Sequence, residues 1–462
     1  MNPSELPVGT ESEPTAGEPA EPDRPAPDNS SGTIYNHVFW LAYAANVSLV
    51  MANALTFRFA EFISWLGGTE ETAGTIVSVG IIGALTVRLV LGQAIDNYGT
   101  RRLWMIGGAI YIASTSLFLV IGDLGWPIYL ARLGFASGIA TMFTCSMVHI
   151  QNLVPANRRT EIIGNLGSSG FVGMILGSQL GDWIFRSTPP GQFRFSVLFG
   201  GTVVLGLVYV ALVITLTRGD VHKRAQKTPA VHRLILNYWP GNVVLVAIMM
   251  GISITVTTIF LTRYATSLGL VNGVGTFFTG YAMMAFLFRV QTATWSRTIG
   301  RHRMIWLGLA GHCLGHGFLP FVTEEWHFLI PAVACGIGHA LLFPAVVSLG
   351  AGAFPKEYRG SGTTITLGFI ELGAAVSAPI LGWVIDQGGG LGFTQMFWVS
   401  SAIALTVGIY YAIANPSVDV ETEVPSPYSD PQKVETPSPI SCRLKPCLQT
   451  SQGETVSKPR QG

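Results

Sequence analysis

The chain has 462 residues, of which 49% are hydrophobic and only 11% are charged. An ordinary soluble domain carries about 25% charged residues, so this composition excludes a water-soluble globular protein of this size. The net charge of +1 and the lack of a basic block give no reason to expect a nucleic-acid partner. The composition indicates a chain that lies largely within a lipid bilayer.

Residues 1–33 and 416–462 differ from the rest of the chain, because they are rich in Pro, Ser, Thr and Glu. Segments of this composition bury too little apolar surface to fold, so we expect two disordered tails, the first of them acidic and Pro-rich. A secretory signal would need a basic start followed directly by an apolar run. We therefore expect the first apolar helix to be retained.

The region between the tails holds twelve runs long enough to cross a bilayer, which needs about 20 apolar residues per helix. The longest polar break, residues 218–237, divides these runs six and six. We therefore predict an N-terminal six-helix bundle at 34–217, a cytoplasmic linker at 218–237 and a C-terminal six-helix bundle at 238–415. The predicted spans are 35–58, 74–95, 102–122, 126–150, 161–186, 194–217, 238–262, 274–295, 303–322, 327–350, 361–386 and 393–414.

Lysines and arginines collect in alternate loops, and the opposite loops hold mostly acidic residues. Basic loops face the cytoplasm in multi-pass proteins. The pattern predicts that both tails and the linker are cytoplasmic, in a protein of the plasma (inner) membrane.

The two halves of the chain repeat a spaced set of residues at an offset of 201 positions. The set is Arg88, Asp96 and Gly99 in the first half and Arg289, Arg297 and Gly300 in the second. Repeated halves with a binding site between them are a known plan for secondary transporters. The fold class we predict is an all-α membrane protein of twelve helices in two six-helix repeats.

The stretch "GQAIDNYGTRR", between the second and third spans, resembles the G-x-x-x-D-x-x-G-x-R/K loop of the major facilitator superfamily. The resemblance extends over residues 34 to 415. It implies a monomeric transporter that works by alternating access. It also implies a cytoplasmic latch, in which Asp96 lies against the first turn of span 361–386. The latch residues are Gly92, Asp96, Gly99, Arg101, Arg102 and Arg159. Because Arg297 stands at the repeat position of Asp96, we expect the latch in one half only.

Glycines at four-residue and longer spacing in span 161–186 resemble a motif of proton-driven exporters. They are Gly164, Gly173, Gly177 and Gly181, with Ser178 at a position where the motif has proline. The pattern favours export. The alternative is that these small residues only let helices pack closely.

Glu371 is the one acid that the sequence places near the bilayer centre, about nine residues into span 361–386 and about 13 Å deep. An intramembrane carboxyl is costly as an ion, so it is suited to gain and lose a proton. Arg132, in a pattern that resembles the R-x-x-x-G-x-G signature of the family, is expected to assist proton coupling. Alternatively, Glu371 forms a fixed ion pair. Arg132 alternatively binds an anionic substrate or donates to backbone carbonyls between helices.

Other polar residues within the spans are candidates for the substrate cavity. Arg88 and Arg289 either snorkel to the interface or face the cavity and favour an anion. Asn46 and Asn53 share a helix face, and His339 lies in a span that lines the pathway in the resembling family.

Three further groups have structural interpretations. Arg58 and Glu61 predict a local gate or helix-end anchor. His312 and His316 have metal-like i,i+4 spacing, but without a third ligand we expect no metal site. Two of the five cysteines, Cys442 and Cys447, form a pair in the tail that we do not assign to a metal.

The chain holds no G-x-x-x-x-G-K-[ST] loop, G-x-S-x-G elbow or H-E-x-x-H site, so we expect neither an enzyme nor a cofactor. We predict a proton-coupled antiporter that exports a small organic solute, with protons and the bilayer as its other partners. One alternative is a transporter of small carboxylate-like anions that uses the intramembrane arginines. The other is a non-transporting membrane sensor or scaffold.

Overall fold

The computed structural model describes residues 37–153, 159–218, 231–355 and 358–415. The chain divides into two compact units, residues 1–420 and residues 421–462. The second unit lies wholly outside the described residues, as do the predicted tails at 1–33 and 416–462, so only the first unit is considered below.

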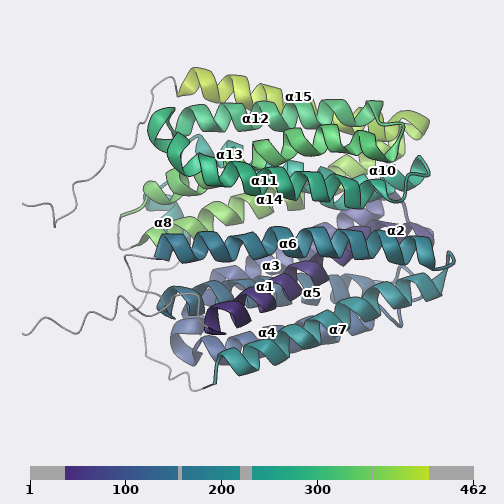
Figure 1. The fold of residues 1–462 in the computed structure, drawn as a ribbon, viewed down its shortest axis with the longest axis horizontal. Helices are drawn as coiled ribbons and strands as arrows, with labels where there is room; N and C mark the ends of the chain where they lie inside the picture. The colour runs from purple at the N-terminus through teal and green to yellow at the C-terminus, as the bar shows by residue number, and fades with distance from the viewer. Residues whose placement is uncertain (1–36, 154–158, 219–230, 356–357, 416–462) are drawn as a thin grey trace, which may run out of the picture. The chain divides into compact units, whose positions relative to one another are not determined.

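Every long element in the described ranges is a helix, and the long helices run side by side in similar directions (Figure 1). The first membrane segment joins α1 (His37–Leu55), a 3-10 turn (Thr56–Arg58) and α2 (Phe59–Trp65). The seventh joins α9 (Val243–Thr255), a π-helical turn (Val256–Phe260) and α10 (Leu261–Ser267). The other ten are α3 (Glu70–Tyr98), α4 (Thr100–Leu117), α5 (Trp126–Leu153), α6 (Arg159–Ser187), α7 (Gln192–Leu216), α11 (Gly273–Thr298), α12 (Arg301–Phe318), α13 (Leu329–Gly352), α14 (Arg359–Gln387) and α15 (Gly392–Ala414).

The prediction of an all-α membrane protein is confirmed, since eight of these segments are long and apolar enough to cross a bilayer. The remaining segments, α4, α6, α11 and α12, contain more glycine, polar or basic residues. We call α1–α7 the N-terminal helices and α9–α15 the C-terminal helices. The contacts do not separate these two groups into units of their own, so the six-and-six domain boundaries stay a prediction.

The predicted spans 35–58 and 238–262 end too early, because each was ended next to an arginine. The first helix continues past Arg58 to Trp65, and the seventh continues past Arg263 to Ser267. Both arginines pair with carboxylates inside the protein, so neither has to reach the interface.

The seventh segment also begins later than predicted. The helix is interrupted at Pro240 and Gly241, and Gly241 has a φ of +68°. The membrane helix starts at Val243. Residues 231–237 of the predicted linker form the short helix α8 (Val231–Asn237), whose Leu234 packs against Phe354 and Ile365.

The turns that begin α4 and α12 have the same backbone geometry. Gly99 has a φ of +86° and Gly300 a φ of +83°, a region that L side chains rarely adopt. The repeat of 201 residues therefore extends to backbone conformation, and both turns need glycine.

The N-terminal and C-terminal helices meet along two pairs, α3 with α14 and α6 with α11. In the first pair a Cβ atom at Gly74 would collide with the carbonyl oxygen of Ala378, and one at Gly382 with the backbone of Glu70. The two backbones are therefore in direct contact at one end of α3 and α14.

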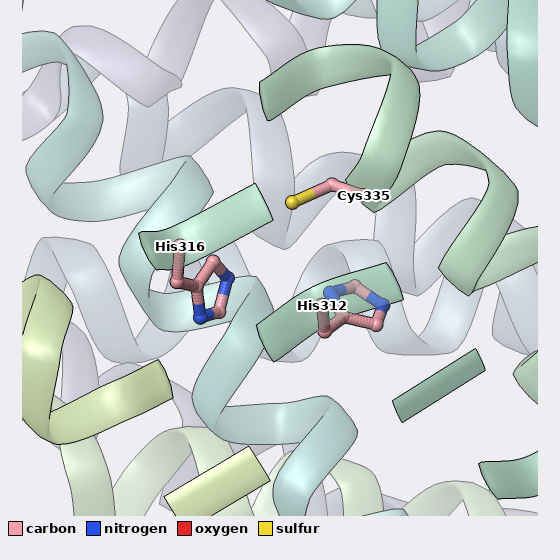
Figure 2. A group of neighbouring side chains, drawn as sticks. All are labelled: His312, His316 and Cys335. Carbon is pink, nitrogen blue, oxygen red and sulfur yellow. The ribbon is translucent and has the colours of Figure 1, made fainter. Parts of the chain in front are cut away.

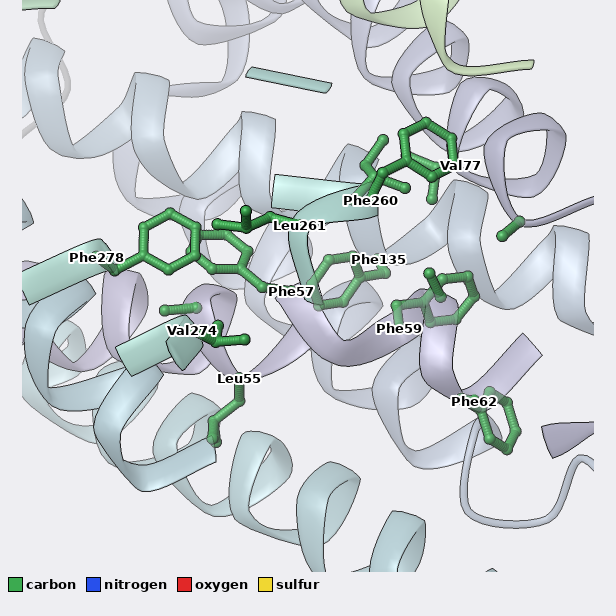
Figure 3. Packing of buried hydrophobic residues seen from close by; sticks show 14 of the residues in the cluster. Leu55, Phe57, Phe59, Phe62, Val77, Phe135, Phe260, Leu261, Val274 and Phe278 are labelled. Atoms are coloured by element: carbon green, nitrogen blue, oxygen red, sulfur yellow. The ribbon is translucent and has the colours of Figure 1, made fainter. Parts of the chain in front are cut away.

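The largest group of buried apolar residues draws on both sets of helices (Figure 3). Phe57 and Phe59 come from the first segment, and Phe260 and Phe278 come from the C-terminal helices. The rings of Phe57 and Phe278 lie 4.7 Å apart between centroids. This aromatic layer joins the two sets of helices next to the cavity described below.

Candidate functional site

A cavity of about 410 Å³ lies between the N-terminal and C-terminal helices. Pockets of a few hundred Å³ with apolar walls and few polar groups are typical of small-molecule sites. Most of its lining is apolar and includes Phe59 and Phe135. The charged side chains among its lining residues are Arg88, Arg132 and Glu371.

Arg88 and Glu371 form an ion pair across the two sets of helices. Nη2 of Arg88, on α3, lies 2.7 Å from Oε1 of Glu371, on α14. Nη1 of Arg88 also donates to the Thr144 hydroxyl at 3.4 Å, and Oε2 of Glu371 has no hydrogen-bond partner among the described residues. Arg88 therefore faces the cavity and does not snorkel.

Arg132 lies on α5 in the cavity wall. Its Cζ lies 4.6 Å from the ring centre of Phe59 and 5.0 Å from that of Phe135, so both rings stabilise the cation. Its Nε and Nη1 are buried without a hydrogen-bond partner among the described residues. Glu371 is paired with Arg88 and not with Arg132. The expected role of Arg132 in proton coupling therefore stays a prediction.

His339 and Asn53 both line the cavity. The His339 ring lies between two aromatic rings, 5.7 Å from that of Tyr281 and 5.5 Å from that of Phe343 between centroids. The substrate role predicted for His339 and Asn53 is compatible with these positions and stays a prediction.

Two other predicted cavity residues lie elsewhere. Asn46 is buried and donates to the hydroxyl of Ser169 at 2.6 Å, which ties α1 to α6. Arg289 is not among the lining residues of the cavity, and its Cζ lies 5.7 Å from the ring of Phe171 and 5.2 Å from that of Phe343. The cavity as described does not extend to either residue.

One end of the helices, which we call the outer end, holds the turns at residues 66–69, 188–191 and 268–272. The opposite end, with the turns at Gly99 and Gly300, is the basic end. At the outer end Nη2 of Arg58 pairs with Oδ1 of Asp182 at 2.5 Å and donates to the carbonyl of Val271 at 2.9 Å. The same Asp182 accepts from the backbone N–H of Gly275 at 2.6 Å. The first membrane segment is therefore tied to the turn at 268–272, and α6 is tied to α11.

Arg263 extends this network from the other side. Its Nη1 lies 3.2 Å from Oε2 of Glu61, and its Nε lies 2.7 Å from Oε1 of Glu70. The five side chains together are named the outer closure: Arg58, Glu61, Glu70, Asp182 and Arg263. The outer closure joins N-terminal to C-terminal helices, so Arg58 and Glu61 do more than anchor a helix end.

The predicted latch lies at the basic end and is only partly described. Arg101 and Arg102 are exposed on the first turn of α4. The side chains of Asp96 and Arg159 and the surroundings of Gly92 lie outside the described residues. The latch therefore stays a prediction.

Packing explains the glycines of α6. A Cβ atom at Gly173 would lie 2.7 Å from the carbonyl oxygen of Val47, and one at Gly177 would lie 2.5 Å from that of Met51. Both glycines let α6 approach the backbone of α1, which is the alternative to an export motif. Gly181 is less crowded, with Nε of Arg58 as its nearest atom at 3.8 Å, and Gly164 lies outside the described side chains.

Asp182, Arg263 and Cys335 could not be identified as candidates from the sequence. Asp182 and Arg263 lie near helix ends, where charges are ordinary, and their partners are more than 100 residues away. Cys335 lies beside His312 and His316 on the neighbouring helix, a third candidate ligand that does not accompany these histidines in sequence. The expectation of no metal site there stays a prediction.

The arrangement defines a class of protein. Membrane helices in two repeated groups surround a cavity with an intramembrane ion pair, which is the plan of a secondary transporter. The family model for the Major Facilitator Superfamily matches residues 32–273 and again 243–446. The chain belongs to the Major Facilitator Superfamily, and it is an integral, multi-pass membrane transporter of a small molecule.

Individual relatives agree with this family. An uncharacterised MFS-type transporter of Burkholderia mallei (strain SAVP1) is 24% identical over 352 residues, which are 74% of this chain and 83% of the relative. The solved D-xylose-proton symporter has a TM-score of 0.68 at 14% identity, over 81% of this chain and 96% of the symporter. The nucleoside transporter NupG has a TM-score of 0.66 at 11% identity, over 82% and 99% of the two chains. At these identities the solved structures show the fold alone.

Proposed function

We propose that the protein is a proton-coupled transporter of a small organic solute, with Glu371 as the group that gains and loses the proton. The observation that carries this proposal is the ion pair between Arg88 and Glu371, which joins α3 to α14 in the cavity wall. A proton on Glu371 removes the negative charge that holds Arg88. Protonation therefore weakens a bond between the two sets of helices, which links proton uptake to their separation.

The surroundings of Glu371 support this coupling. The cationic groups that line the same cavity are Arg88 and Arg132, and the other ionisable side chains are those of Tyr281 and His339. No second acid lines the cavity among the described residues, so protonation of Glu371 removes the one negative charge in that lining. The proton therefore binds to Glu371 in the wall of the same cavity that would hold the solute.

We further propose the finer points of the transport reaction. Basic loops favour cytoplasmic termini in the plasma (inner) membrane, and the outer closure then lies on the extracytoplasmic side. Export by antiport is the direction that the glycine pattern of α6 favours, although packing accounts for Gly173 and Gly177. We expect a monomer, with a cytoplasmic latch formed by Asp96 with Arg101, Arg102 and Arg159.

Proteoliposomes test the proposal. Purified protein is reconstituted with a pH-sensitive dye inside, and a panel that includes a nucleoside, D-xylose and 5-aminolevulinic acid is added to either side. The panel follows the solutes named for structural relatives, and it is a choice of probes rather than an assignment. A solute that moves protons across the membrane only when protein is present supports the proposal. Movement of a solute through the protein without any movement of protons would contradict the proposed coupling.

Glu371→Gln separates coupling from transport. This variant keeps a similar shape but cannot lose a proton, so gradient-driven uptake is lost while exchange of labelled solute at equal concentrations remains. Glu71→Gln is the matched control, since it makes the same change at an exposed side chain that does not line the cavity. Unchanged gradient-driven transport by Glu371→Gln would rule out Glu371 as the coupling group.

A second candidate function is transport of a small organic anion, and Arg132 is the observation that favours it. Glu371 neutralises Arg88, whereas no described carboxylate pairs with Arg132. A carboxylate in the cavity would accept hydrogen bonds from the buried guanidinium of Arg132, whose Nε and Nη1 have no partner among the described residues. Arg132→Lys keeps the charge but not this geometry, so transport of a carboxylate should fall in both Arg132→Lys and Arg132→Gln. Equal transport by all three proteins would exclude the anion site.

A further inference from the structure

A cluster of three metal-ligand side chains lies outside the transport cavity, between α12 and α13. His312 and His316 lie on consecutive turns of α12, and Cys335 lies on α13 (Figure 2). One ligand atom from each residue lies within 4.8 Å of the other two. None of the three lines the cavity, so the cluster is separate from the proposed transport site.

The cluster is fully enclosed by protein. His316 and Cys335 have no exposed surface, and His312 is 3% exposed. Both ring nitrogens of His312 and Nε2 of His316 have no hydrogen-bond partner among the described residues. Buried polar atoms are almost always paired, because leaving them unpaired costs free energy. A group bound between the three unpaired nitrogens and the thiol would supply the missing partners.

The third element of the site is a side chain that orients His316. The Oγ of Ser400, on α15, lies 2.8 Å from Nδ1 of His316. A metal-binding histidine ordinarily holds its second ring nitrogen in such a hydrogen bond, which fixes the tautomer. With Nδ1 held by Ser400, Nε2 is the atom left for a ligand.

Small residues bring the two helices close enough for a shared site. A Cβ atom at Gly315 would collide with Sγ of Cys335, and one at Gly338 would lie 3.0 Å from Cδ2 of His312. A three-coordinate ion with bonds near 2.0–2.3 Å needs its ligand atoms about 3.5 Å apart. The three ligand atoms lie within 4.8 Å of one another, so side-chain movements of about 1 Å bring them to that separation.

We propose that His312, His316 and Cys335 bind one copper(I) ion. Thiolate sulfur and imidazole nitrogen are ligands that copper(I) and zinc both accept, so charge decides between them. When copper(I) binds, the thiol of Cys335 releases its proton to water and the thiolate binds the ion. The site gains the charge of Cu⁺ and loses the charge of H⁺, so its net charge does not change. Zinc(II) with one thiolate and two neutral imidazoles leaves an uncompensated positive charge among apolar helices, where charge is costly. No described carboxylate belongs to the cluster to offset it.

The bound ion would tie α12 to α13, and through Ser400 to α15. Cys335 lies six residues into α13, about 9 Å from its outer end. The site would therefore stabilise the C-terminal helices without contact to the solute. This separates its test from that of transport.

Metal binding is measured on the full chain with Cys442→Ser and Cys447→Ser, which removes the tail cysteines as competing ligands. The purified protein is loaded anaerobically with copper(I), desalted and analysed for metal, and its thermal unfolding is followed. We expect one copper ion per chain and a higher Tm. Cys335→Ser and His316→Gln should abolish both effects, and Ser400→Ala should weaken binding about tenfold.

Cys313→Ser is the matched control, because Cys313 lies on the same helix but contacts Ser401 at 3.3 Å instead of the cluster. It should bind copper as before. Retained stoichiometric copper in Cys335→Ser, or its loss in Cys313→Ser, would overturn the site. Tight binding of zinc to the cluster in preference to copper(I) would overturn the assignment of a monovalent ion.

X-ray absorption on the copper-loaded protein, with Cys335 and both histidines intact, is independent of whether any site variant folds. One sulfur and two nitrogen neighbours are expected at bonding distance. A shell of sulfur alone, or of nitrogen and oxygen alone, contradicts the proposed ligands.

Discussion

Arg58 of the first helix donates at once to the carboxylate of Asp182, on α6, and to the backbone carbonyl of Val271, next to α11. One guanidinium group therefore joins N-terminal and C-terminal helices at the outer end. Arg58 is 2% exposed and Asp182 is 3% exposed, and the ring of Phe185 covers the cation at 4.1 Å. The contact is a buried ion pair and not a surface one.

Loss of the Asp182 charge should open the outer end. Removing one partner of a buried ion pair costs about 3–5 kcal/mol, since the other charge stays buried without compensation. In Asp182→Asn, a cysteine placed at the cavity residue Ile81 should therefore react at least about tenfold faster with an impermeant thiol reagent added at the outer end. Glu71→Gln is the control, because the Glu71 side chain is exposed. Equal labelling in both variants would show that Asp182 does not hold the outer end closed.

The pairing of Arg88 with Glu371 should appear as coupling in a double-mutant cycle. Arg88→Gln and Glu371→Gln each leave one partner unpaired, and each should lower the free energy of unfolding by about 3 kcal/mol. The double variant should cost less than the sum of the two by at least about 1 kcal/mol. Thermal or denaturant unfolding in detergent measures these terms. Strictly additive losses would mean that the ion pair adds no stability.

Gly74 should not tolerate a methyl group. A Cβ there would overlap the carbonyl of Ala378, so Gly74→Ala forces α3 and α14 apart at the outer end. Gly200→Ala is the control, since no atom lies within 4 Å of its added Cβ, and alanine stabilises a helix by about 1 kcal/mol over glycine. We expect a lower Tm for the first variant and an equal or higher Tm for the second. The reverse order would disprove close packing at Gly74.

The latch prediction rests on the difference between the repeats. Asp96→Asn should release the basic end, whereas Arg297→Gln should not, because only the first repeat holds a carboxylate at this position. Accessibility of a single cysteine in the cavity, probed from the basic end, measures the effect. If Arg297→Gln increases labelling as much as Asp96→Asn does, the latch is not confined to one half.

The sequence was sufficient to predict most helices but not the long-range ion pairs. Apolar run length predicted spans such as 393–414 within one residue of α15. It ends the first and seventh spans too early, at Arg58 and Arg263, because a charge in an apolar run is also the ordinary mark of a helix end. Their partners lie elsewhere in the chain, and periodicity carries no information on such pairing.

The same limit applied to the candidate site. Arg88 and Glu371 were both singled out, but their contact joins residues 283 positions apart and only the fold brings them together. The third candidate ligand beside His312 and His316 likewise lies on a neighbouring helix, where spacing along the sequence does not reveal it. Chemistry within one helix could be predicted from sequence, whereas chemistry between helices could not.

The π-helical turn at Val256–Phe260 has a geometric consequence for the outer end. Successive residues of an α-helix are rotated by about 100°, so one residue more or less in this turn rotates everything that follows it by that angle. Arg263 and its contacts with Glu61 and Glu70 come directly after the turn, while Thr257 and Ile259 within it line the cavity. Some of the side chains that line the cavity thus belong to the same five residues that determine which way Arg263 points.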